Sequence, residues 1–372
     1  MKLTIERATL LKSLGHVQSV VERRNTIPIL SNVRLEAGPN GLALNATDMD
    51  LEIVETVAAD VAQPGSTTAP AHTFYEIARK LPDGAQVEIA YSGEDTQLTL
   101  RSGRSRFSLS CLPVEDFPNM VGGTFTHTFT LRAADLRGLI DRTKFAISTE
   151  ETRYYLNGIF LHGTVAEGVD VMRAVATDGH RLARVEIPLP EGAAGMPGVI
   201  VPRKTVAEVR KLIEETNSDV TISLSDSKIR FAFDDAMLTS KLIDGTFPDY
   251  ERVIPQDNDK ILVVEKKPFA DAVDRVSAIS TEKSRAIKVA VDKGTLTLSA
   301  SSPEAGSAVE EVSVSYDSSP MEIGFNSRYL LDIMNQIEGD AARFAMADAA
   351  SPTVIREVAD GSAVYVLMPM RV

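Results

Sequence analysis

Residues 115–120 read EDFPNM and residues 245–250 read GTFPDY, which places Pro118 and Pro248 at an interval of 130 residues. Each stretch ends a long segment of helix-like and strand-like patterns, and Pro369 ends a third segment of similar length. Self-similarity at a fixed interval is typical of a chain built from internal repeats. The sequence therefore predicts three copies of one structural unit.

Each third of the chain contains two segments with the periodicity of an amphipathic helix. Their apolar residues recur at spacings of three and four, which places them on one helix face. Pro202 and Pro268 suit a first helical position, and Asn326 suits an N-cap. The six predicted helices span residues 6–24, 71–83, 132–144, 203–215, 266–285 and 327–338.

Short runs of alternating apolar and polar residues follow these helices and predict strands. Thr47-Asp48 and Thr177-Asp178 follow similar runs and repeat the 130-residue interval. We therefore predict an α+β fold of three similar domains, with two helices packed on one side of antiparallel sheet in each. A loose succession of helices and strands without repetition is the alternative. The predicted domains span residues 1–124, 125–250 and 251–372, and the strands include 87–91, 98–101, 107–111, 171–176, 182–187, 220–224, 229–233, 295–299 and 364–368.

The composition indicates a soluble cytoplasmic protein. The N-terminus breaks its apolar character at Glu6 and Arg7, unlike a signal peptide. No run of 18 apolar residues predicts a membrane span. Cys111 is the single cysteine, which excludes an internal disulfide framework. The 372-residue chain has a net charge of −13, which by itself argues against binding nucleic acid.

The distribution of charge changes that interpretation. The six predicted helices together hold more Lys and Arg than Asp and Glu, whereas the rest of the chain is strongly acidic. A basic surface on an acidic body suits a protein that holds DNA phosphates on one face, without reading sequence. Charged residues of either sign on solvated helix faces are the simpler alternative.

Common catalytic signatures are missing from the sequence. It contains no GxxxxGK[ST], HExxH, CxxC or GxSxG motif, and its five histidines show no metal-ligand spacing, so we expect no cofactor and no metal. The best catalytic candidate is ATDGHRL (176–182), where Asp178 and His180 would form an acid–base pair beside Arg181. A hairpin turn around Asp-Gly is the favoured alternative. Cys111 is a weaker candidate nucleophile.

Several stretches, quoted with their numbers, resemble the β subunits of bacterial DNA polymerase III over the whole chain and in the right order. They are RSGRSRFSLSCLP (101–113), RYYLNG (153–158), ATDGHRLA (176–183), VIVPRK (199–204), SKLIDGTFPDYERVIP (240–255), EIGFN (322–326) and YVLMPMRV (365–372). The resemblance implies three DNA-clamp domains per chain and two chains closed head to tail into a ring around duplex DNA. It implies a sliding clamp in the cytoplasm, associated with the nucleoid, that performs no catalysis and tethers the replicative polymerase.

The resemblance also implies a groove for short, partly apolar peptides of the polymerase α subunit, the clamp loader, other polymerases and repair proteins. Methionines suit such a groove because they adapt to varied side chains. Alternation along the C-terminal strand predicts that Met368 and Met370 face one way. Carried over by position, the groove residues are Leu156, Thr177, Gly179, His180, Arg181, Leu182, Pro248, Arg252, Val253, Asn326, Tyr329, Val366, Met368, Pro369, Met370 and Arg371.

For DNA, the resemblance points to five positions: Arg24, His72, Glu150, Tyr154 and Tyr155. His72 stands where a relative has arginine, and Glu150 replaces a glutamine and would repel phosphate. For the two tyrosines, a partly buried strand pair is an equal alternative.

For ring closure, the resemblance points to one edge of the first domain and one helix of the third. We expect Phe107 and Leu109 to meet Ala278 and Ile279 of the other chain. Basic residues near the first pair would face acidic residues near the second: Arg104 and Arg106 against Glu304, Glu310 or Glu311.

Two other classes of function remain possible from the residues alone. An enzyme that uses Asp178 and His180 would lose turnover when His180 is changed. An acidic scaffold that never touches DNA would show no loss of DNA retention when Arg24 and Lys204 are reversed to glutamate.

Overall fold

The computed structural model describes residues 1–94, 96–120, 123–214, 216–280 and 285–372. Over these residues the chain forms two compact units. The first comprises Met1–Arg137, Pro190–Pro197 and Lys204–Leu242, and the second comprises Gly138–Leu189, Gly198–Arg203 and Ile243–Val372.

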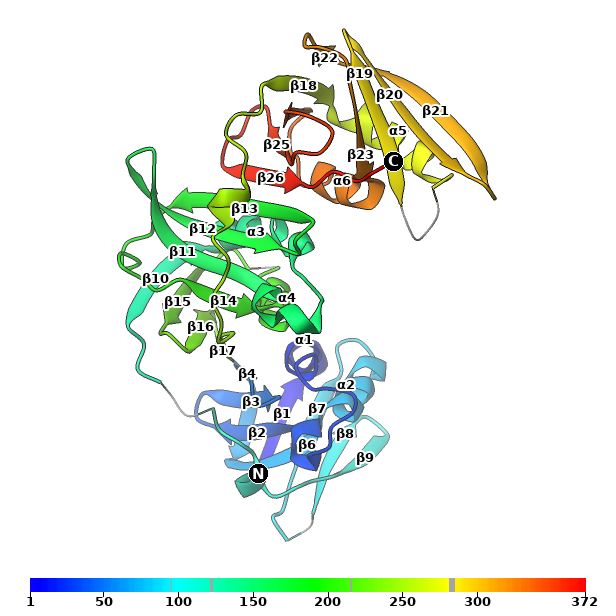
Figure 1. The fold of residues 1–372 in the computed structure, drawn as a ribbon. Helices are drawn as coiled ribbons and strands as arrows, with labels where there is room; N and C mark the ends of the chain where they lie inside the picture. Colours follow the sequence, from blue (N-terminus) through cyan, green and yellow to red (C-terminus); the bar gives the residue numbers. More distant parts are fainter. Residues whose placement is uncertain (95, 121–122, 215, 281–284) are drawn as a thin grey trace. The chain divides into compact units, whose positions relative to one another are not determined.

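A similar order of elements recurs three times along the chain, with one strand fewer between the two helices of the second repeat over the described residues (Figure 1). The first repeat contains β1 (Lys2–Glu6), α1 (Arg7–Gln18), β2 (Asn32–Gly38), β3 (Gly41–Thr47), β4 (Leu51–Val57), β5 (Asp60–Gln63), β6 (Gly65–Pro70), α2 (Ala71–Lys80), β7 (Gln86–Ala90), β8 (Gln97–Ser102) and β9 (Ser105–Ser110). The second contains β10 (His127–Arg132), α3 (Ala133–Asp141), β11 (Gly158–Ala166), β12 (Val169–Thr177), β13 (Arg181–Pro188), β14 (Val199–Pro202), α4 (Arg203–Leu212), β15 (Asp219–Leu224), β16 (Lys228–Phe233) and β17 (Ala236–Lys241).

The third repeat follows the same order. It contains β18 (Lys260–Glu265), α5 (Lys266–Ser277), β19 (Ala286–Asp292), β20 (Thr295–Ser302), β21 (Gly306–Ser313), β22 (Ser315–Tyr316), β23 (Met321–Asn326), α6 (Ser327–Met334), β24 (Ala341–Met346), β25 (Thr353–Glu357) and β26 (Ala363–Leu367). Short 3₁₀ helices connect these elements: η1 (Pro28–Ser31), η2 (Val114–Asp116), η3 (Lys144–Ala146), η4 (Glu151–Leu156) and η5 (Tyr250–Val253). The predicted triplication and the α+β class are confirmed.

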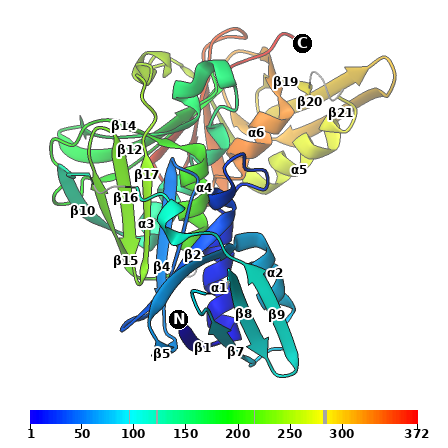
Figure 2. The same cartoon turned by 90° about the horizontal axis from the view of Figure 1, so that it is seen from below.

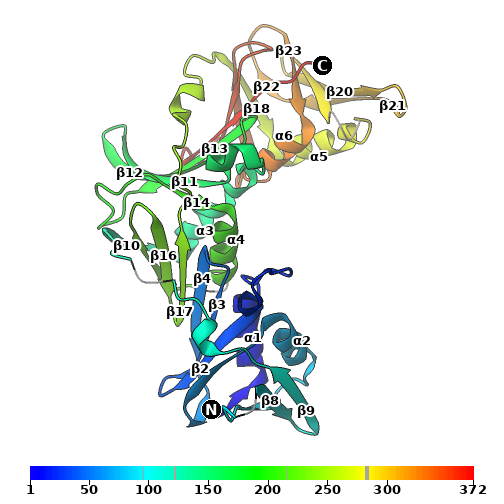
Figure 3. The same cartoon turned by 60° about the horizontal axis from the view of Figure 1, so that its bottom comes forward.

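In the first unit, strands of two repeats join one antiparallel sheet. Its eight strands run in the order β10-β15-β16-β17-β4-β3-β2-β6, and a second sheet runs β5-β1-β7-β8-β9. β17 of the second repeat pairs with β4 of the first, with Leu238 opposite Ile53. Helices α1 and α2 lie side by side against the strands of the first repeat (Figure 3). Leu10, Leu14 and Val17 on α1 are buried, as the helical spacing predicts.

The second unit repeats this way of joining strands. Its nine-stranded sheet runs β14-β11-β12-β13-β26-β25-β24-β18-β22, and its four-stranded sheet runs β21-β20-β19-β23. β26, the last strand of the third repeat, pairs with β13 of the second, with Tyr365 opposite Ala183. Helices α5 and α6 lie side by side over the strands of the third repeat (Figure 2).

The helix boundaries correct the sequence predictions in detail. The predicted first helix runs to residue 24, but α1 ends at Gln18. The N–H of Val21 then donates to the carbonyl of Gln18 in a tighter turn, so the apolar spacing continues beyond the helix. Residues 281–284 of the predicted fifth helix lie outside the described residues.

The predicted helix starts hold in one case and shift in two. Asn326 caps α6, because its side chain accepts from the N–H groups of Arg328 and Tyr329. Pro202 instead ends β14, one residue before α4, and Pro268 is the third residue of α5 rather than the first. Pro268 is tolerated there because the first N–H groups of a helix have no partner within it.

The described part of the chain contains neither a membrane-spanning helix nor a cluster of metal-binding side chains. None of its helices has the length and apolar character needed to cross a membrane. The same residues include no group of three or more His, Cys, Asp or Glu side chains arranged to hold a metal ion.

Candidate functional site

A tight turn joins β12 and β13 and builds one end of the site. The Thr177 hydroxyl donates to the Arg181 carbonyl at 2.7 Å, and Asp178 Oδ1 accepts from the N–H groups of His180 and Arg181 at 2.9 and 3.0 Å. Gly179 has φ +88°, a left-handed conformation that favours glycine. The hairpin alternative for this stretch is confirmed, and the Asp178 carboxylate is occupied by the turn.

The Arg181 side chain then ties the turn to other elements of the second unit. It is nearly buried and donates to Asp178 Oδ2 at 3.2 Å, to Asp332 Oδ2 at 2.5 Å and to the Phe145 carbonyl at 2.6 Å. Its guanidinium also lies 4.2 Å from the centre of the Tyr329 ring. A cation with this many partners holds the turn, α6 and η3 in fixed positions.

A cavity of about 300 Å³ opens beside this turn, which is a size typical of small ligand sites. Most of its wall is apolar, and nine of the predicted groove residues meet around it. They are Leu156, Thr177, Gly179, Arg181, Leu182, Pro248, Val253, Val366 and Met368. We call this set and its cavity the groove.

Four further residues line the groove and were not predicted for it: Arg153, Tyr155, Asp249 and Tyr250. Tyr250 closes the GTFPDY stretch that revealed the repeat, and Asp249 follows the predicted Pro248, so proximity in sequence was the available signal. Tyr155 was predicted for DNA instead.

The C-terminal tail departs from the predicted arrangement. Met368 lines the groove, whereas Pro369, Met370 and Arg371 line a different cavity of about 600 Å³. The prediction that Met368 and Met370 face one way is wrong, because β26 ends at Leu367 and strand alternation ends with it. The Met370 N–H donates to the Gly324 carbonyl at 2.8 Å, which fixes the tail along β23 instead.

The remaining predicted groove residues do not line the groove cavity. The His180 ring stacks on Tyr329 with ring centres 6.3 Å apart, and Asn326 is occupied as the cap of α6. Arg252 pairs with Asp249 at 2.7 Å on the exposed side of η5.

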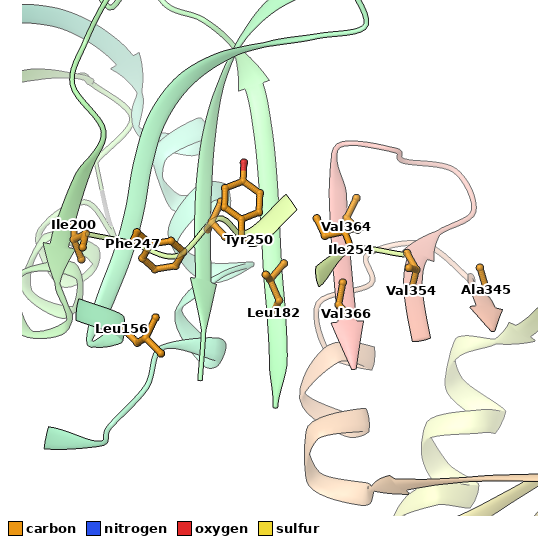
Figure 4. Close-up of a cluster of buried hydrophobic side chains, with 11 residues drawn as sticks. Leu156, Leu182, Ile200, Phe247, Tyr250, Ile254, Ala345, Val354, Val364 and Val366 are labelled. Carbon is orange, nitrogen blue, oxygen red and sulfur yellow. The ribbon is translucent and has the colours of Figure 1, made fainter. Parts of the chain in front are cut away.

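A packed apolar cluster lies beneath the groove (Figure 4). It joins strands from two repeats, since Leu182 of β13 and Val366 of β26 stand opposite each other in the sheet. The segment after β17 covers the cluster with Phe247 and Tyr250, both buried. A close-packed floor of this kind holds the groove in one shape before any ligand arrives.

The residues predicted for DNA have different surroundings. Arg24 is exposed beyond the end of α1. Both ring nitrogens of His72 already have partners in the first unit, the Gln18 side chain at 2.8 Å and the Val21 carbonyl at 3.0 Å. The Glu150 carboxylate is held by Arg153 at 2.8 Å, which lowers the pKa of Glu150.

The two adjacent tyrosines lie in a 3₁₀ helix, η4, so the strand-pair alternative is wrong. Tyr154 is 53% exposed and Tyr155 is partly buried. Cys111 is buried, and desolvation raises the pKa of its thiol, which disfavours the nucleophilic thiolate.

The residues predicted for ring closure lie at sheet edges and a helix end. β9 carries Phe107, partly buried, and Leu109, buried, and it ends its sheet. Just beyond α5, Ala278 is exposed and Ile279 is partly buried.

Comparison with protein families matches three consecutive parts of the chain. Residues 1–121 match the N-terminal domain of the DNA polymerase III beta subunit, residues 130–249 its central domain and residues 251–371 its C-terminal domain. These matches cover most of the sequence.

Individual relatives are similar to this chain over its full length. The beta sliding clamp of Caulobacter vibrioides is 58% identical over 100% of both chains, and that of Escherichia coli K12 is 40% identical over 100% of both. A crystal structure of the Caulobacter crescentus clamp, with polyethylene glycol bound to a putative beta-motif tethering region, superimposes with a TM-score of 0.98 at 58% identity, covering 100% of this chain and 99% of the other.

A clamp from Bartonella birtlesii bound to griselimycin superimposes with a TM-score of 0.97 at 50% identity, covering 100% of both chains. The three domain matches, the 58% identity over the full length and the shared fold all point to the same family. The chain belongs to the family of DNA polymerase III beta subunits, the sliding clamps that act as non-catalytic processivity factors of the replicative polymerase.

Proposed function

We propose that this sliding clamp recruits its partners through the groove beside the turn at Thr177–Arg181. The observation that carries the proposal is that nine residues from distant parts of the sequence gather around one preformed cavity. The partners are the polymerase α subunit, the clamp loader, other polymerases and repair proteins, each through a short peptide. The Bartonella birtlesii clamp, which binds griselimycin, supports a ligand site on this fold.

The chemistry of the groove suits a peptide with apolar and polar residues. Leu182 and Val366 give it an apolar floor, and Met368, 38% exposed, offers a flexible side chain at the opening. Arg153 and Asp249 supply a cation and an anion at the wall. Apolar side chains would enter the cavity while the peptide backbone and polar side chains bind at its rim.

The repeat itself predicts how two chains would close into a ring. β17, the last strand of the second repeat, pairs with β4, and β26, the last strand of the third, pairs with β13. β4 and β13 hold the same place in their repeats, and β21 holds that place in the third. β9 is the last strand of the first repeat, and both β9 and β21 end their sheets. We therefore propose that β9 pairs with β21 of a partner subunit, at both contacts of a homodimer.

Side chains around these edges fit the pairing. Phe107 and Leu109 would pack near Ile279 of the partner subunit. Glu310 is already bound by Arg275 of its own chain at 2.5 Å, so Arg104 and Arg106 would pair with the partner subunit's Glu304 and Glu311, both exposed. The predicted contact through Ala278 stays part of this proposal.

The proposed ring would enclose duplex DNA without reading its sequence. Arg24, exposed after α1, would contact phosphates weakly and reversibly, which permits sliding. Tyr154 offers an exposed ring to sugars or bases. His72 and Glu150 would act through their neighbours Gln18 and Arg153. We place the protein in the cytoplasm at the nucleoid, with domain boundaries near residues 124 and 250.

Retention on DNA tests the ring. The clamp is loaded onto nicked circular duplex with its cognate clamp loader and ATP, and half of the sample is then linearised. Release from linear DNA with persistence on circles would establish a topological link. Equal retention on both would indicate ordinary surface binding, and retention on neither would favour a scaffold that does not engage DNA.

A single charge reversal tests whether Arg24 contacts the DNA. Lys204 is bound by Glu22 at 2.5 Å and Asp48 at 2.6 Å, so reversing it would disturb folding as well as any DNA contact. Arg24→Glu changes an exposed residue and should speed the sliding of the loaded clamp along circular DNA at low salt while leaving the unfolding midpoint unchanged. An unchanged diffusion coefficient on DNA would contradict a phosphate contact at Arg24.

A binding assay tests the groove. A fluorescein-labelled peptide with the C-terminal sequence of the cognate polymerase α subunit should bind the clamp, and griselimycin should displace it. Met368→Asp places a charge at the opening and should weaken binding at least tenfold, because the peptide's apolar side chains would meet a carboxylate. Binding that neither griselimycin nor this substitution affects would place the peptide elsewhere.

A further inference from the structure

Behind the groove wall, the Tyr250 hydroxyl enters a small polar network. The ring of Tyr250 is 5% exposed and lines the groove. Its hydroxyl oxygen lies 2.9 Å from His162 Nε2 and 3.2 Å from Arg173 Nη1. Figure 4 shows the hydroxyl at the far end of the ring from Leu182, which belongs to the groove floor. One side chain therefore contacts the groove with its ring and the network with its hydroxyl.

The direction of each hydrogen bond in this network follows from the donors available. A guanidinium can only donate, so Arg173 donates to the Tyr250 oxygen. We assign the single hydroxyl proton of Tyr250 to the bond with His162 Nε2, which in this arrangement carries no proton and accepts it. The proton of the neutral ring is placed on Nδ1, 3.4 Å from the Gly163 carbonyl.

Carboxylates hold Arg173 in place. Arg173 is 6% exposed, and its Nε donates to Glu186 at 2.9 Å while Nη1 also contacts Glu251. Glu251 follows Tyr250 in η5, whereas Glu186 lies on β13. The guanidinium thus binds the segment that forms the groove wall to two strands of the nine-stranded sheet.

A stack of rings attaches the same segment at a second point. His162 stacks on Phe160 with ring centres 4.7 Å apart and an angle of 21°, and Phe160 stacks on Phe247 at 4.8 Å and 10°. Phe247 precedes Pro248 of the groove by one residue. His162 is therefore linked to both ends of the segment from Phe247 to Tyr250, directly to Tyr250 and through Phe160 to Phe247.

We propose that His162, Arg173 and Tyr250 form a latch that positions the groove wall, and that the clamp binds partner peptides with full affinity only while His162 is neutral. The inference rests on the proposed peptide-binding function of the groove. His162 and Arg173 are positioning residues, because neither lines the cavity. They act on the peptide through the ring of Tyr250.

Protonation of His162 would open the latch. A proton on Nε2 would turn that atom into a donor facing the Tyr250 oxygen, and it would add a second cation beside Arg173. The charged and titratable groups that face His162 are Arg173, Tyr250 and Glu251. Burial lowers the pKa of His162 below its ordinary value, with the charge of Arg173 acting in the same direction. The neutral form, and with it full affinity, is therefore present at pH 7.5 and lost as the pH falls through this lowered value.

Removing the hydroxyl tests the latch at neutral pH. Tyr250→Phe keeps the ring but leaves His162 and Arg173 without their shared partner. The Kd of the fluorescein-labelled polymerase peptide, measured by anisotropy at pH 7.5, should rise about threefold to tenfold. Tyr316→Phe is the matched control, because it removes a hydroxyl that donates to the Ser319 carbonyl at 2.6 Å and does not line the groove. Its Kd should equal that of the wild type.

A titration downward from pH 7.5, over the whole range in which circular dichroism shows the clamp to be folded, tests the role of His162 with a histidine-free peptide. Wild-type affinity should fall across this range, whereas His162→Gln, whose amide oxygen can accept from Tyr250 without titrating, should bind normally and give a flat profile. A wild-type profile in H162Q, or an unchanged Kd in Y250F, would overturn the latch while leaving the groove intact. A wild-type clamp that fails to bind the peptide at any pH would overturn both proposals.

Discussion

The turn from Thr47 to Leu51 and the turn from Thr177 to Arg181 are built from the same hydrogen bonds. In the first, the Thr47 hydroxyl donates to the Leu51 carbonyl at 2.9 Å, and Asp48 Oδ1 accepts from the N–H groups of Asp50 and Leu51. Each atom pair has its counterpart 130 residues later. In both turns these hydrogen bonds are made by the side chains of the shared Thr-Asp dipeptide.

The two turns differ in where their cation comes from. Asp48 Oδ2 binds Lys204 of α4, which also donates to the Val20 carbonyl at 3.0 Å. At the second turn the cation is Arg181, part of the turn itself, where the first turn has Leu51. Lys204 ties the first turn to a helix of the next repeat, whereas Arg181 reaches α6 and η3 while its turn lines a cavity. The same local hydrogen-bond frame can thus serve as a joint or as part of a binding site, depending on whether its cation comes from another repeat or from the turn itself.

The largest effect should come from removing the cation of the second turn. Arg181→Leu copies the first turn and leaves the Asp178 and Asp332 carboxylates, 15% and 29% exposed, without their partner. We expect a loss of about 3 kcal/mol in the free energy of unfolding, measured by urea denaturation. Arg132→Leu, which breaks an ion pair between the exposed Arg132 and Asp135, should leave the free energy of unfolding nearly unchanged. Equal losses for Arg181→Leu and Arg132→Leu would show that the ion pairs of Arg181 do not stabilise the turn.

A smaller effect should come from the backbone of the second turn. Gly179→Ala puts a Cβ on a residue with φ +88° and within 2.7 Å of Arg153 Nη1, so it should destabilise the clamp by about 1–2 kcal/mol and weaken peptide binding. Met49 has φ +79° at the corresponding position of the first turn. Met49→Gly should therefore raise the free energy of unfolding, by about 0.5 kcal/mol after the entropy of the unfolded chain is included. If Gly179→Ala raised the free energy of unfolding, the left-handed backbone of the second turn would not be what requires glycine there.

The smallest loss of stability among the three destabilising turn substitutions should come from removing the cation of the first turn. Lys204→Met keeps the length of the side chain but leaves Asp48 and Glu22 without their ion pair. Because the Lys204 side chain is 34% exposed, we expect a loss of only about 1 kcal/mol, with faster amide hydrogen exchange around Asp48. Lys267→Met, which removes a largely exposed pair with Asp271, is the control and should leave exchange unchanged. A loss of free energy of unfolding as large as that of Arg181→Leu would mean that the two cations stabilise their turns equally.

Features that depend on neighbouring residues were predictable from the sequence. The helical spacing of α1, the cap at Asn326 and the turn at Asp178 each involve residues within a few positions of one another. Local periodicity and side-chain hydrogen bonds to nearby backbone determine them. The nine predicted residues that line the groove cavity came from the family resemblance, which predicts positions in the sequence and not contacts in space.

Features that depend on distant partners were missed. The internal hydrogen bonds of His72 join two helices, and Tyr250 reaches His162 across 88 residues. The separation of Met368 from Met370 depends on β23, which captures the tail through Gly324. No spacing in the sequence encodes such pairs, because they exist only once separate elements pack.

The sequence by itself determined that the chain repeats three times, that each repeat is α+β, and that Asp178-Gly179 forms a hairpin turn. These follow from periodicity, turn chemistry and the interval of 130 residues. Only the tertiary structure decided which edge strands join, that Lys204 binds the first turn, and that Tyr250 forms a wall of the groove with its hydroxyl bound behind it. The physical reason is that backbone pairing and buried polar contacts are satisfied by whichever groups packing brings within about 3 Å, and that distance is set by the whole fold.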